Sequence, residues 1–478
     1  MADLLKKTIN NKSLFKAVYL TVTVFFSVQF LEYVSYVAIF IVLIWGCYLT
    51  ISDVVSKRVK KVFLGKYFAV FLGLGVLSNI LSIIGGYANS FGIVIGIGML
   101  IVTAQFMYLF FANKDDKSQT AKLEIYSISK ILFYIISVLN TIGFVLLIVF
   151  HQLIEIFSKR LIIYDNRYSG IYMNPNMGAY NCFICIVCGV ILLNKTFCGS
   201  INKKSLKLYV AIPFMAISYL SLMLSASRGA VLILTVFISV LVAYYFFYTI
   251  THKKTAKRTV AVILSIVFVI LTPVAFFKGT FSSLTSYIIE KDNINIGEKV
   301  KRKATDYNDE LHTKSGKITF EHITGKDDGS GRVEIYKKSF NLFLQKPILG
   351  WGNGNVLLMG DTEKSTIENV LLQGDYKIFE AHNAYLTILS TGGILSFIVF
   401  MFCGAIILLI IFLSAKKSFL NATLFAFITA CCAYAFVEPS MVFYPSFVVA
   451  TIWFFMGNAV AIAKEQIPDK LINKKFLK

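Results

Sequence analysis

The chain has 478 residues, of which 57% are hydrophobic and only 15% are charged, and its formal net charge is +21. Soluble proteins carry about 25% charged residues, so this composition excludes a soluble globular domain. We predict an all-α polytopic membrane protein with about 12 transmembrane helices.

Twelve apolar segments approach the roughly 20 residues that a helix needs to cross the bilayer core. The first follows four lysines but has no small-residue cleavage site, so we interpret it as an uncleaved anchor. The tenth is long enough to begin as an external helix. The predicted spans lie near residues 14–32, 34–51, 67–86, 91–112, 131–150, 177–194, 208–224, 230–249, 259–277, 385–413, 419–437 and 442–463.

These spans divide the chain into four predicted regions. Helices one to nine occupy residues 1–277, and helices ten to twelve occupy residues 384–463. Between them, residues 278–383 form a large, partly helical external loop, and residues 464–478 form a basic cytoplasmic tail. A loop of this length usually has a function of its own.

The positive charge is unevenly distributed over the loops. Most of the 47 Lys and Arg residues fall on one side when the loops are assigned alternately, as in the positive-inside pattern. Both termini are therefore expected in the cytoplasm, while the regions around Arg167 and Arg228 and the long loop face outward. The charge indicates topology and attraction to anionic lipid, so we predict no nucleic-acid partner.

The eight cysteines do not indicate a metal site. Cys182, Cys185 and Cys188 recur every three residues on one face of the sixth span, but no His or carboxylate lies near them in the sequence. Close helix packing explains this pattern better than zinc does. We predict neither a metal nor a cofactor.

The second half of the long loop has a readable pattern. In "SGRVEIYKKSFNLFLQKP", apolar residues at helical spacing predict an amphipathic helix with Arg332 in its first turn and Pro347 after its end. The glycine-rich turn "LGWGNGN" follows, and its backbone is expected to approach a ligand closely. Asn383 is expected to cap the next helix, which places His382 just before a helix N-terminus.

Two other outward segments carry polar residues. In "DNRYSGIYMNPNMGAY", Asn176 is expected to cap the sixth span, and "SASRGA" contains Arg228 between two uncharged runs. Each residue alone has a structural explanation: a snorkelling turn residue for Arg228, a solvated loop charge for Arg167 or Arg332, and a capping or packing role for His382. Glu438, in "VEPSMVFYPS", is equally explained as a solvent-facing loop residue.

Several arginines on one outer face indicate a phosphate or diphosphate ligand, because a guanidinium binds phosphate oxygens in a bidentate manner and stays charged. The helix N-terminus is expected to keep His382 neutral, so that it can accept a proton from an attacking hydroxyl. Because ATP and nucleotide sugars are absent outside the cell, a reaction there needs a donor already activated in the membrane. A sugar linked to a lipid diphosphate fulfils this condition.

Four segments, in this order, resemble the O-antigen ligase and polymerase superfamily of bacterial membrane glycosyltransferases. They are "RYSGIYMNPNMGAY", "SASRGA", "SGRVEIYKKSFNLFLQKPILGWGNGN" and "HNAYLTILSTGGIL". The resemblance covers residues from about 160 to 400. It implies a C-type glycosyltransferase with a helical membrane fold and with no nucleotide or required metal.

The resemblance also implies roles for individual residues. Arg167, Arg228 and Arg332 match the arginines expected to hold the donor diphosphate. His382 matches the histidine expected to activate the acceptor hydroxyl, so the expected catalytic residues are His382, Arg228 and Arg332. Tyr336 stands where many relatives have Trp. Further candidates for sugar or acceptor contacts are Glu438, Asn383 and Asn176.

Three functions remain open at this stage. The leading one is a polymerase that joins glycan repeat units on undecaprenyl diphosphate at the outer face of the cytoplasmic membrane, by inverting transfer to an acceptor hydroxyl. The second is a ligase that moves the finished glycan to lipid A core, a protein or a wall component. The third is a transporter or flippase, which the nearly uncharged spans disfavour. Expected partners are the lipid-linked donor, the glycan acceptor, membrane lipids, a chain-length regulator and a flippase.

Overall fold

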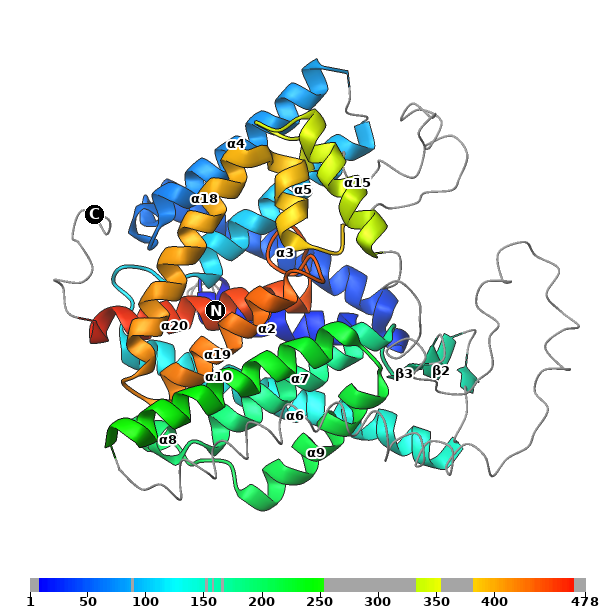
Figure 1. Cartoon of the computed structure of the whole chain (residues 1–478), viewed down its shortest axis with the longest axis vertical. Helices are drawn as coiled ribbons and strands as arrows, with labels where there is room; N and C mark the ends of the chain where they lie inside the picture. Colours follow the sequence, from blue (N-terminus) through cyan, green and yellow to red (C-terminus); the bar gives the residue numbers. More distant parts are fainter. Residues whose placement is uncertain are drawn as a thin grey trace, which may run out of the picture. The chain divides into compact units, whose positions relative to one another are not determined.

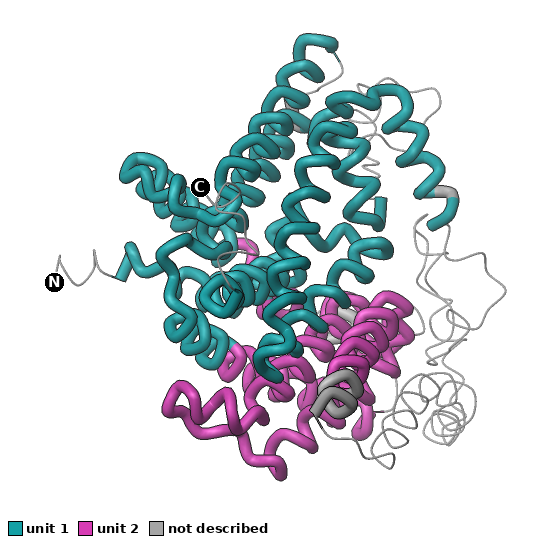
Figure 2. Tube along the Cα trace, turned by 60° about the vertical axis from the view of Figure 1, so that its left-hand side comes forward, with its two compact units in different colours: residues 1–23, 37–128, 328–478 teal, residues 24–36, 129–327 magenta. Residues whose placement is uncertain are grey.

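The computed structural model describes residues 8–86, 90–150, 154–156, 159–164, 167–252, 332–353 and 381–467. This part of the chain is almost entirely helical (Figure 1), so the prediction of an all-α polytopic membrane protein is confirmed. The predicted ninth span and most of the predicted external loop lie outside the described residues. The chain forms two compact units, each built from separated stretches of sequence (Figure 2).

Unit 1 contains residues 1–23, 37–128 and 328–478. Its most buried long helix is α20, whose apolar window is 89% buried inside the protein and which packs on α18, α19 and η3. The helices that lie wholly in this unit are η2 (Arg58–Lys61), α4 (Gly65–Ile84), α5 (Ser90–Gln105), the π-helical η3 (Phe106–Phe110), α15 (Arg332–Gln345), α18 (Ala384–Ala415), α19 (Phe419–Tyr434) and α20 (Phe447–Gln466).

Unit 2 contains residues 24–36 and 129–327. Its central helix, α7, packs on α9 and α10 and is buried along nearly its whole length. The elements that lie wholly in this unit are η1 (Gln29–Leu31), β1 (Ile154–Ile156), β2 (Lys159–Tyr164), β3 (Arg167–Gly170), α7 (Pro175–Leu193), α8 (Lys195–Ser200), α9 (Leu208–Leu224) and α10 (Arg228–His252). The remaining helices, α2 (Lys12–Phe26), α3 (Glu32–Val55) and α6 (Ser118–Phe150), have residues in both units.

Eight helices among the described residues are long and apolar enough to cross a membrane, and α9 and α19 are shorter apolar helices. The first predicted span, 14–32, is wrong in its extent because α2 ends at Phe26. The residues after it turn and pair with the segment before α7: the Gln29 amide donates to the Ile171 carbonyl, and the Met173 amide to the Ser27 carbonyl. These backbone bonds end the helix where the largely apolar sequence of residues 14–32 predicts that it continues.

A small antiparallel sheet was not expected from the sequence. Strands β1, β2 and β3 form it in chain order, with a register irregularity between Ile162 and Ile163. Apolar residues of β2 lie in a buried cluster with Tyr168 and with the end of α6 at Leu147. The strands are short, and the alternation of apolar and polar residues that marks a half-buried strand is weak here.

Helix α18 is sharply kinked at Gly393, whose φ of 68° and ψ of −173° are open almost only to glycine. The glycine-rich turn after α15 satisfies the backbone groups that the kink releases. The Trp351 and Gly352 amides donate to the carbonyls of Ser390 and Thr391, and the Ile394 amide donates to the Pro347 carbonyl. The backbone of the glycine-rich turn therefore lies close to the backbone of α18. From the sequence, we expected this turn to approach a ligand.

One end of unit 1 is strongly basic. Lys12 pairs with Asp53, Lys16 lies 3.0 Å from Glu124, and Lys61 lies 2.7 Å from Asp115. Hydrogen bonds join the loops at this end, from the Lys114 amide to the Lys61 carbonyl and from Lys464 to the carbonyls of Asn113 and Lys114. Exposed cations cover the same end: Lys57, Arg58, Lys60, Lys66, Lys117, Lys416 and Lys417.

Candidate functional site

Three of the predicted residues form one cluster in unit 1, at the opposite end of α18 from its basic C-terminus. Arg332 Nη2 donates to Glu438 Oε1 over 3.1 Å, and His382 Nδ1 lies 3.6 Å from Glu438 Oε2. The side chains of Arg332, Glu438 and His382 are 23%, 18% and 35% exposed, so the cluster is partly desolvated and open to a ligand. A carboxylate thus lies between an arginine and a histidine.

The cluster is assembled from three segments far apart in the sequence. Arg332 is the first described residue of α15, His382 precedes α18, and Glu438 follows α19. The Glu438 loop is held against the start of α18, because the Ala384 amide donates to the Ala435 carbonyl and Asn383 Nδ2 donates to the Phe436 carbonyl over 3.0 Å.

The backbone at His382 is strained, with a φ of 45° in the left-handed region. Asn383 next to it caps α18 as the sequence predicts, since its Oδ1 accepts from the Leu386 amide over 3.0 Å. One hydrogen bond at each polar end fixes the Asn383 side chain beside His382, and each end keeps capacity for a second bond. Strain held in place by such bonds is typical of functional positions.

Tyr336 ties α15 to both neighbouring segments of the cluster. Its hydroxyl donates to the Phe436 carbonyl at 2.8 Å and lies 3.3 Å from the His382 carbonyl. Burial raises the pKa of Tyr336, and Glu438 raises it further, while Arg332 lowers it. The hydroxyl therefore keeps its proton and remains a donor. Tyr336 therefore links α15 to the segments that carry His382 and Glu438.

The other predicted arginines lie in unit 2. Arg167 begins β3, and its guanidinium bridges two segments: Nε donates to the Ser225 carbonyl over 2.8 Å, and Nη2 donates to Asn176 Oδ1 over 2.7 Å. Asn176 is in the first turn of α7, and Ser225 is in the SASRGA turn. Arg167 thus connects two of the segments that the sequence analysis singled out.

The prediction that Asn176 caps α7 is wrong. The cap is Asn174, whose Oδ1 accepts from the Met177 amide over 2.9 Å, with Pro175 as the first helical residue. Proline favours this first position, because its missing N–H is not needed there and its φ already suits a helix. Asn176 consequently points its amide to Arg167.

In the SASRGA turn, Ala226 adopts a left-handed φ of 51° that separates α9 from α10. Ser225 Oγ donates to the Leu222 carbonyl, and Ser227 Oγ accepts from the Ala230 amide, so both serine hydroxyls form hydrogen bonds with backbone groups. Arg228 is the first residue of α10 and is half-buried. A cation is unfavourable at a helix N-terminus, so helix stability does not explain an arginine at this position.

The contact of Arg167 has a measurable consequence. We expect Arg167→Lys to lower the free energy of unfolding by roughly 1–3 kcal/mol, because one ammonium cannot reach both the Ser225 carbonyl and Asn176, and a buried acceptor is left unpaired. Thermal unfolding in detergent measures this loss. A double-mutant cycle with Asn176→Ala isolates the pair, and strictly additive effects would contradict the bridge.

The predicted residues therefore fall into two groups. Arg332, His382, Glu438 and Asn383 belong to unit 1, while Arg167, Asn176 and Arg228 belong to unit 2. Sequence reasoning missed the capping role of Asn174, although the Asn-Pro order signals it. Among the described residues, no group of three or more His, Cys, Asp or Glu side chains is placed to hold a metal ion.

One family model is similar to part of the chain. Residues 213–401 match the family model described as O-antigen ligase, in agreement with the resemblance seen in the sequence. The match includes Arg228, Arg332, His382 and Asn383, while Arg167, Asn176 and Glu438 lie outside it. No curated protein matches the chain.

Proposed function

We propose, from the premise that residues 213–401 form a domain of the O-antigen ligase family, that this protein is a membrane glycosyltransferase. The donor is a glycan on undecaprenyl diphosphate, and the acceptor is a sugar hydroxyl. The observation that carries this proposal is the position of Glu438 between Arg332 and His382. One cluster thus contains a base, a carboxylate that orients the base, and a cation that can bind phosphate.

In the proposed reaction His382 accepts the proton of the acceptor hydroxyl. The hydroxyl oxygen attacks the anomeric carbon of the donor, the bond from that carbon to the diphosphate oxygen breaks, and the configuration inverts. Glu438 stabilises the imidazolium that forms, since its Oε2 lies 3.6 Å from Nδ1. Proton transfer by a positioned base contributes about 10²–10⁴-fold to a rate.

The leaving diphosphate gains negative charge as the bond breaks, and fixed arginines stabilise that charge. Arg332 supplies one guanidinium beside His382. For Arg167 and Arg228 of unit 2 we propose donor-binding roles from the resemblance alone, and Arg228 stands at the N-terminus of α10, where backbone N–H groups also favour an anion. We propose no role for a metal or a cofactor in this step.

We propose a direction for unit 1 in the membrane from the distribution of its charges. Helix α18 begins at the His382 cluster and ends at Lys416 and Lys417, and α20 ends in the basic region at Lys464. Since basic ends face the cytoplasm, the cluster faces outward from the cytoplasmic membrane. We propose the cytoplasmic side for both termini, as the sequence predicts.

We expect Arg228→Ala and Arg332→Ala each to lower glycan transfer about 10²–10³-fold, the loss typical when one charge-stabilising donor is removed. Polymer yield and length in a deletion strain carrying each variant measure this. Lys337→Ala removes an exposed charge from the same helix as Arg332 and is expected to leave the yield unchanged. Normal polymer in both arginine variants would overturn the assigned roles.

Two acceptors fit this chemistry. Polymerisation of repeat units is our leading proposal, and ligation of a finished glycan is the alternative that the description of the matching family favours. In a deletion strain, loss of long chains from the lipid carrier supports polymerisation. Accumulation of long chains on the carrier supports ligation to lipid A core, a protein or a wall component. A chain-length regulator and a flippase are partners only in the polymerisation scheme.

A further inference from the structure

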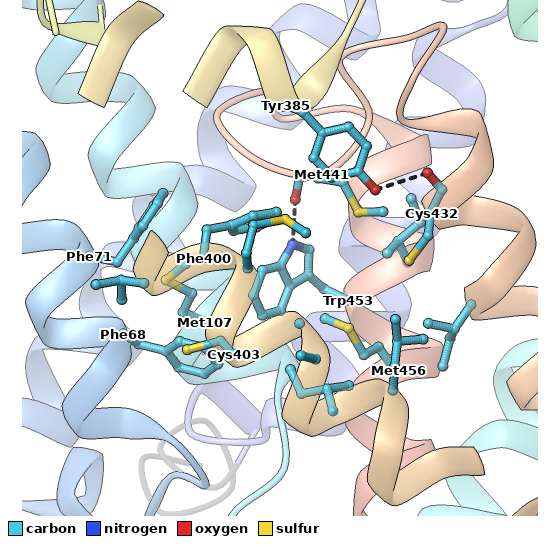
Figure 3. Close-up of a pocket in the computed structure, with 18 residues that line it drawn as sticks. Phe68, Phe71, Met107, Tyr385, Phe400, Cys403, Cys432, Met441, Trp453 and Met456 are labelled. Atoms are coloured by element: carbon cyan, nitrogen blue, oxygen red, sulfur yellow. Dashed lines mark hydrogen bonds between the residues drawn. The ribbon is translucent and has the colours of Figure 1, made fainter. Parts of the chain in front are cut away.

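We propose that an apolar pocket beneath the kink of α18 binds the hydrocarbon chain of the lipid that carries the donor glycan. The pocket has a volume of about 210 Å³ and lies entirely within unit 1 (Figure 3). Tyr385 contributes from the arm of α18 before Gly393, and residues Val399 to Leu408 contribute from the arm after it. The kink thus brings both arms of one helix to the same pocket.

The walls offer a ligand almost no polar atoms. The Tyr385 hydroxyl donates to the Cys432 carbonyl over 3.0 Å, and Trp453 Nε1 donates to the Met441 carbonyl over 2.8 Å. Both rings therefore use their polar atoms in hydrogen bonds within the wall, and their carbon atoms face the pocket (Figure 3). An apolar cavity of this kind stays free of water and takes apolar ligands.

The lining is also adaptable. Met107, Met441 and Met456 bring unbranched, flexible thioethers, which fit irregular shapes. Aromatic rings form the rest of one wall, with Phe68 and Trp453 in an edge-to-face contact at 5.8 Å between centroids. Such a surface suits a flexible, branched hydrocarbon better than a rigid polar molecule.

The pocket is next to the His382 cluster. Tyr385 is the second residue of α18, three positions after His382 in the chain, and its ring is 4.5 Å from that of Phe436. The Phe436 carbonyl in turn accepts from Tyr336 and Asn383. One layer of side chains therefore separates the pocket from the residues proposed to act on the substrate.

The short distance between the pocket and the His382 cluster indicates that the pocket binds the lipid of the donor and not that of the acceptor. This inference rests on the proposed function. In the donor the reacting carbon is bonded to the diphosphate, so the hydrocarbon chain begins only a few bonds away. In a lipid-linked acceptor the reacting hydroxyl is separated from its lipid by the sugars of a repeat unit. A hydrocarbon pocket lined by Tyr385, three residues after His382, fits the donor chain better than the acceptor chain.

Gly404 allows the pocket to be filled without a clash. It lines the pocket, and a Cβ added there meets no heavy atom within 4 Å. We expect Gly404→Phe to raise KM about tenfold or more for a donor with the full undecaprenyl chain, since a loss of a few buried methylene groups has this effect. For a donor with a ten-carbon prenyl chain, KM and kcat stay within about twofold of the unsubstituted protein.

Gly73→Phe is the matched control, because Gly73 also has no neighbour within 4 Å of an added Cβ but does not line the pocket. A binding readout accompanies the kinetics: the purified full chain is photolabelled with a prenyl diphosphate that carries a diazirine near its head. We expect adducts in residues 399–408 or 452–456, prevented by unlabelled undecaprenyl diphosphate and not by phosphatidylglycerol.

Each outcome decides one point. Equal competition by phosphatidylglycerol would show a general lipid site and overturn the assignment, as would an unchanged KM for the long donor in Gly404→Phe together with no adduct in the pocket. If the pocket is labelled specifically but the unsubstituted protein transfers glycan from neither donor, the proposed function fails and the prenyl site stands.

Discussion

The His382→Asn variant is expected to transfer glycan about 10²- to 10⁴-fold more slowly than the unsubstituted protein, with no large change in thermal stability. Asparagine tolerates the left-handed backbone that position 382 adopts, with its φ of 45°. The substitution therefore removes the imidazole while keeping the backbone at the start of α18. Transfer from a lipid-linked donor, measured with purified protein in detergent or nanodiscs, gives the rate.

A second substitution at the same position separates chemistry from strain. His382→Ala also removes the imidazole, but it places alanine in a left-handed conformation at an added cost of about 1 kcal/mol or more. We expect both variants to lose transfer equally and only His382→Ala to unfold at a lower temperature. If His382→Asn transferred glycan at the normal rate, the histidine would be a structural residue and the proposed base would be wrong.

Gly393→Ala is expected to cause the largest loss of stability. A Cβ at this position would lie 2.3 Å from the Ile348 carbonyl oxygen, a backbone atom that cannot move aside alone. Its φ of 68° with a ψ of −173° is also closed to alanine. We expect at least about 3 kcal/mol of destabilisation, since clash and backbone strain add. Thermal unfolding and the yield of monodisperse protein in detergent measure it.

Gly404→Ala is the control for that prediction, because it makes the same change in the same helix where an added Cβ meets open space. It is expected to be neutral or slightly stabilising, because alanine favours helix over glycine by about 1 kcal/mol. Equal stability of the two variants would contradict the structural role of the kink. Loss of the kink would also displace the turn at residues 346–352 and the short arm that carries Tyr385.

The candidate site was partly predictable from the sequence because its signals are local. Asn383 caps α18 and α15 ends before Pro347, since capping and proline geometry depend only on a few neighbouring residues. The contact of Glu438 with Arg332 joins residues 106 positions apart in the chain, and its contact with His382 also joins different segments. No local pattern indicates such a pairing, and in the sequence Glu438 is one more loop carboxylate.

The difference between local signals and contacts of distant segments also explains the wrong end of the first predicted span and the unexpected sheet. The sequence predicts α2 to continue past Phe26, because Val28, Phe30 and Leu31 extend its apolar pattern, but pairing of residues 27–29 with 171–173 ends it. The sheet of β1 to β3 is stabilised by a cluster that includes Leu147 and Leu224 from other elements. Contacts between distant segments override local preference in both places.

Composition and local patterns alone indicate the membrane class, the order and approximate extent of most helices, and the resemblance with which the match of residues 213–401 agrees. These depend on composition, hydropathy over windows of about 20 residues and short motifs. Only the tertiary structure decided that the glycine-rich turn completes the kink of α18, that Arg167 bridges α7 to the SASRGA turn, and that Glu438 joins Arg332 to His382. Each is a contact between segments far apart in the chain, set by packing in three dimensions.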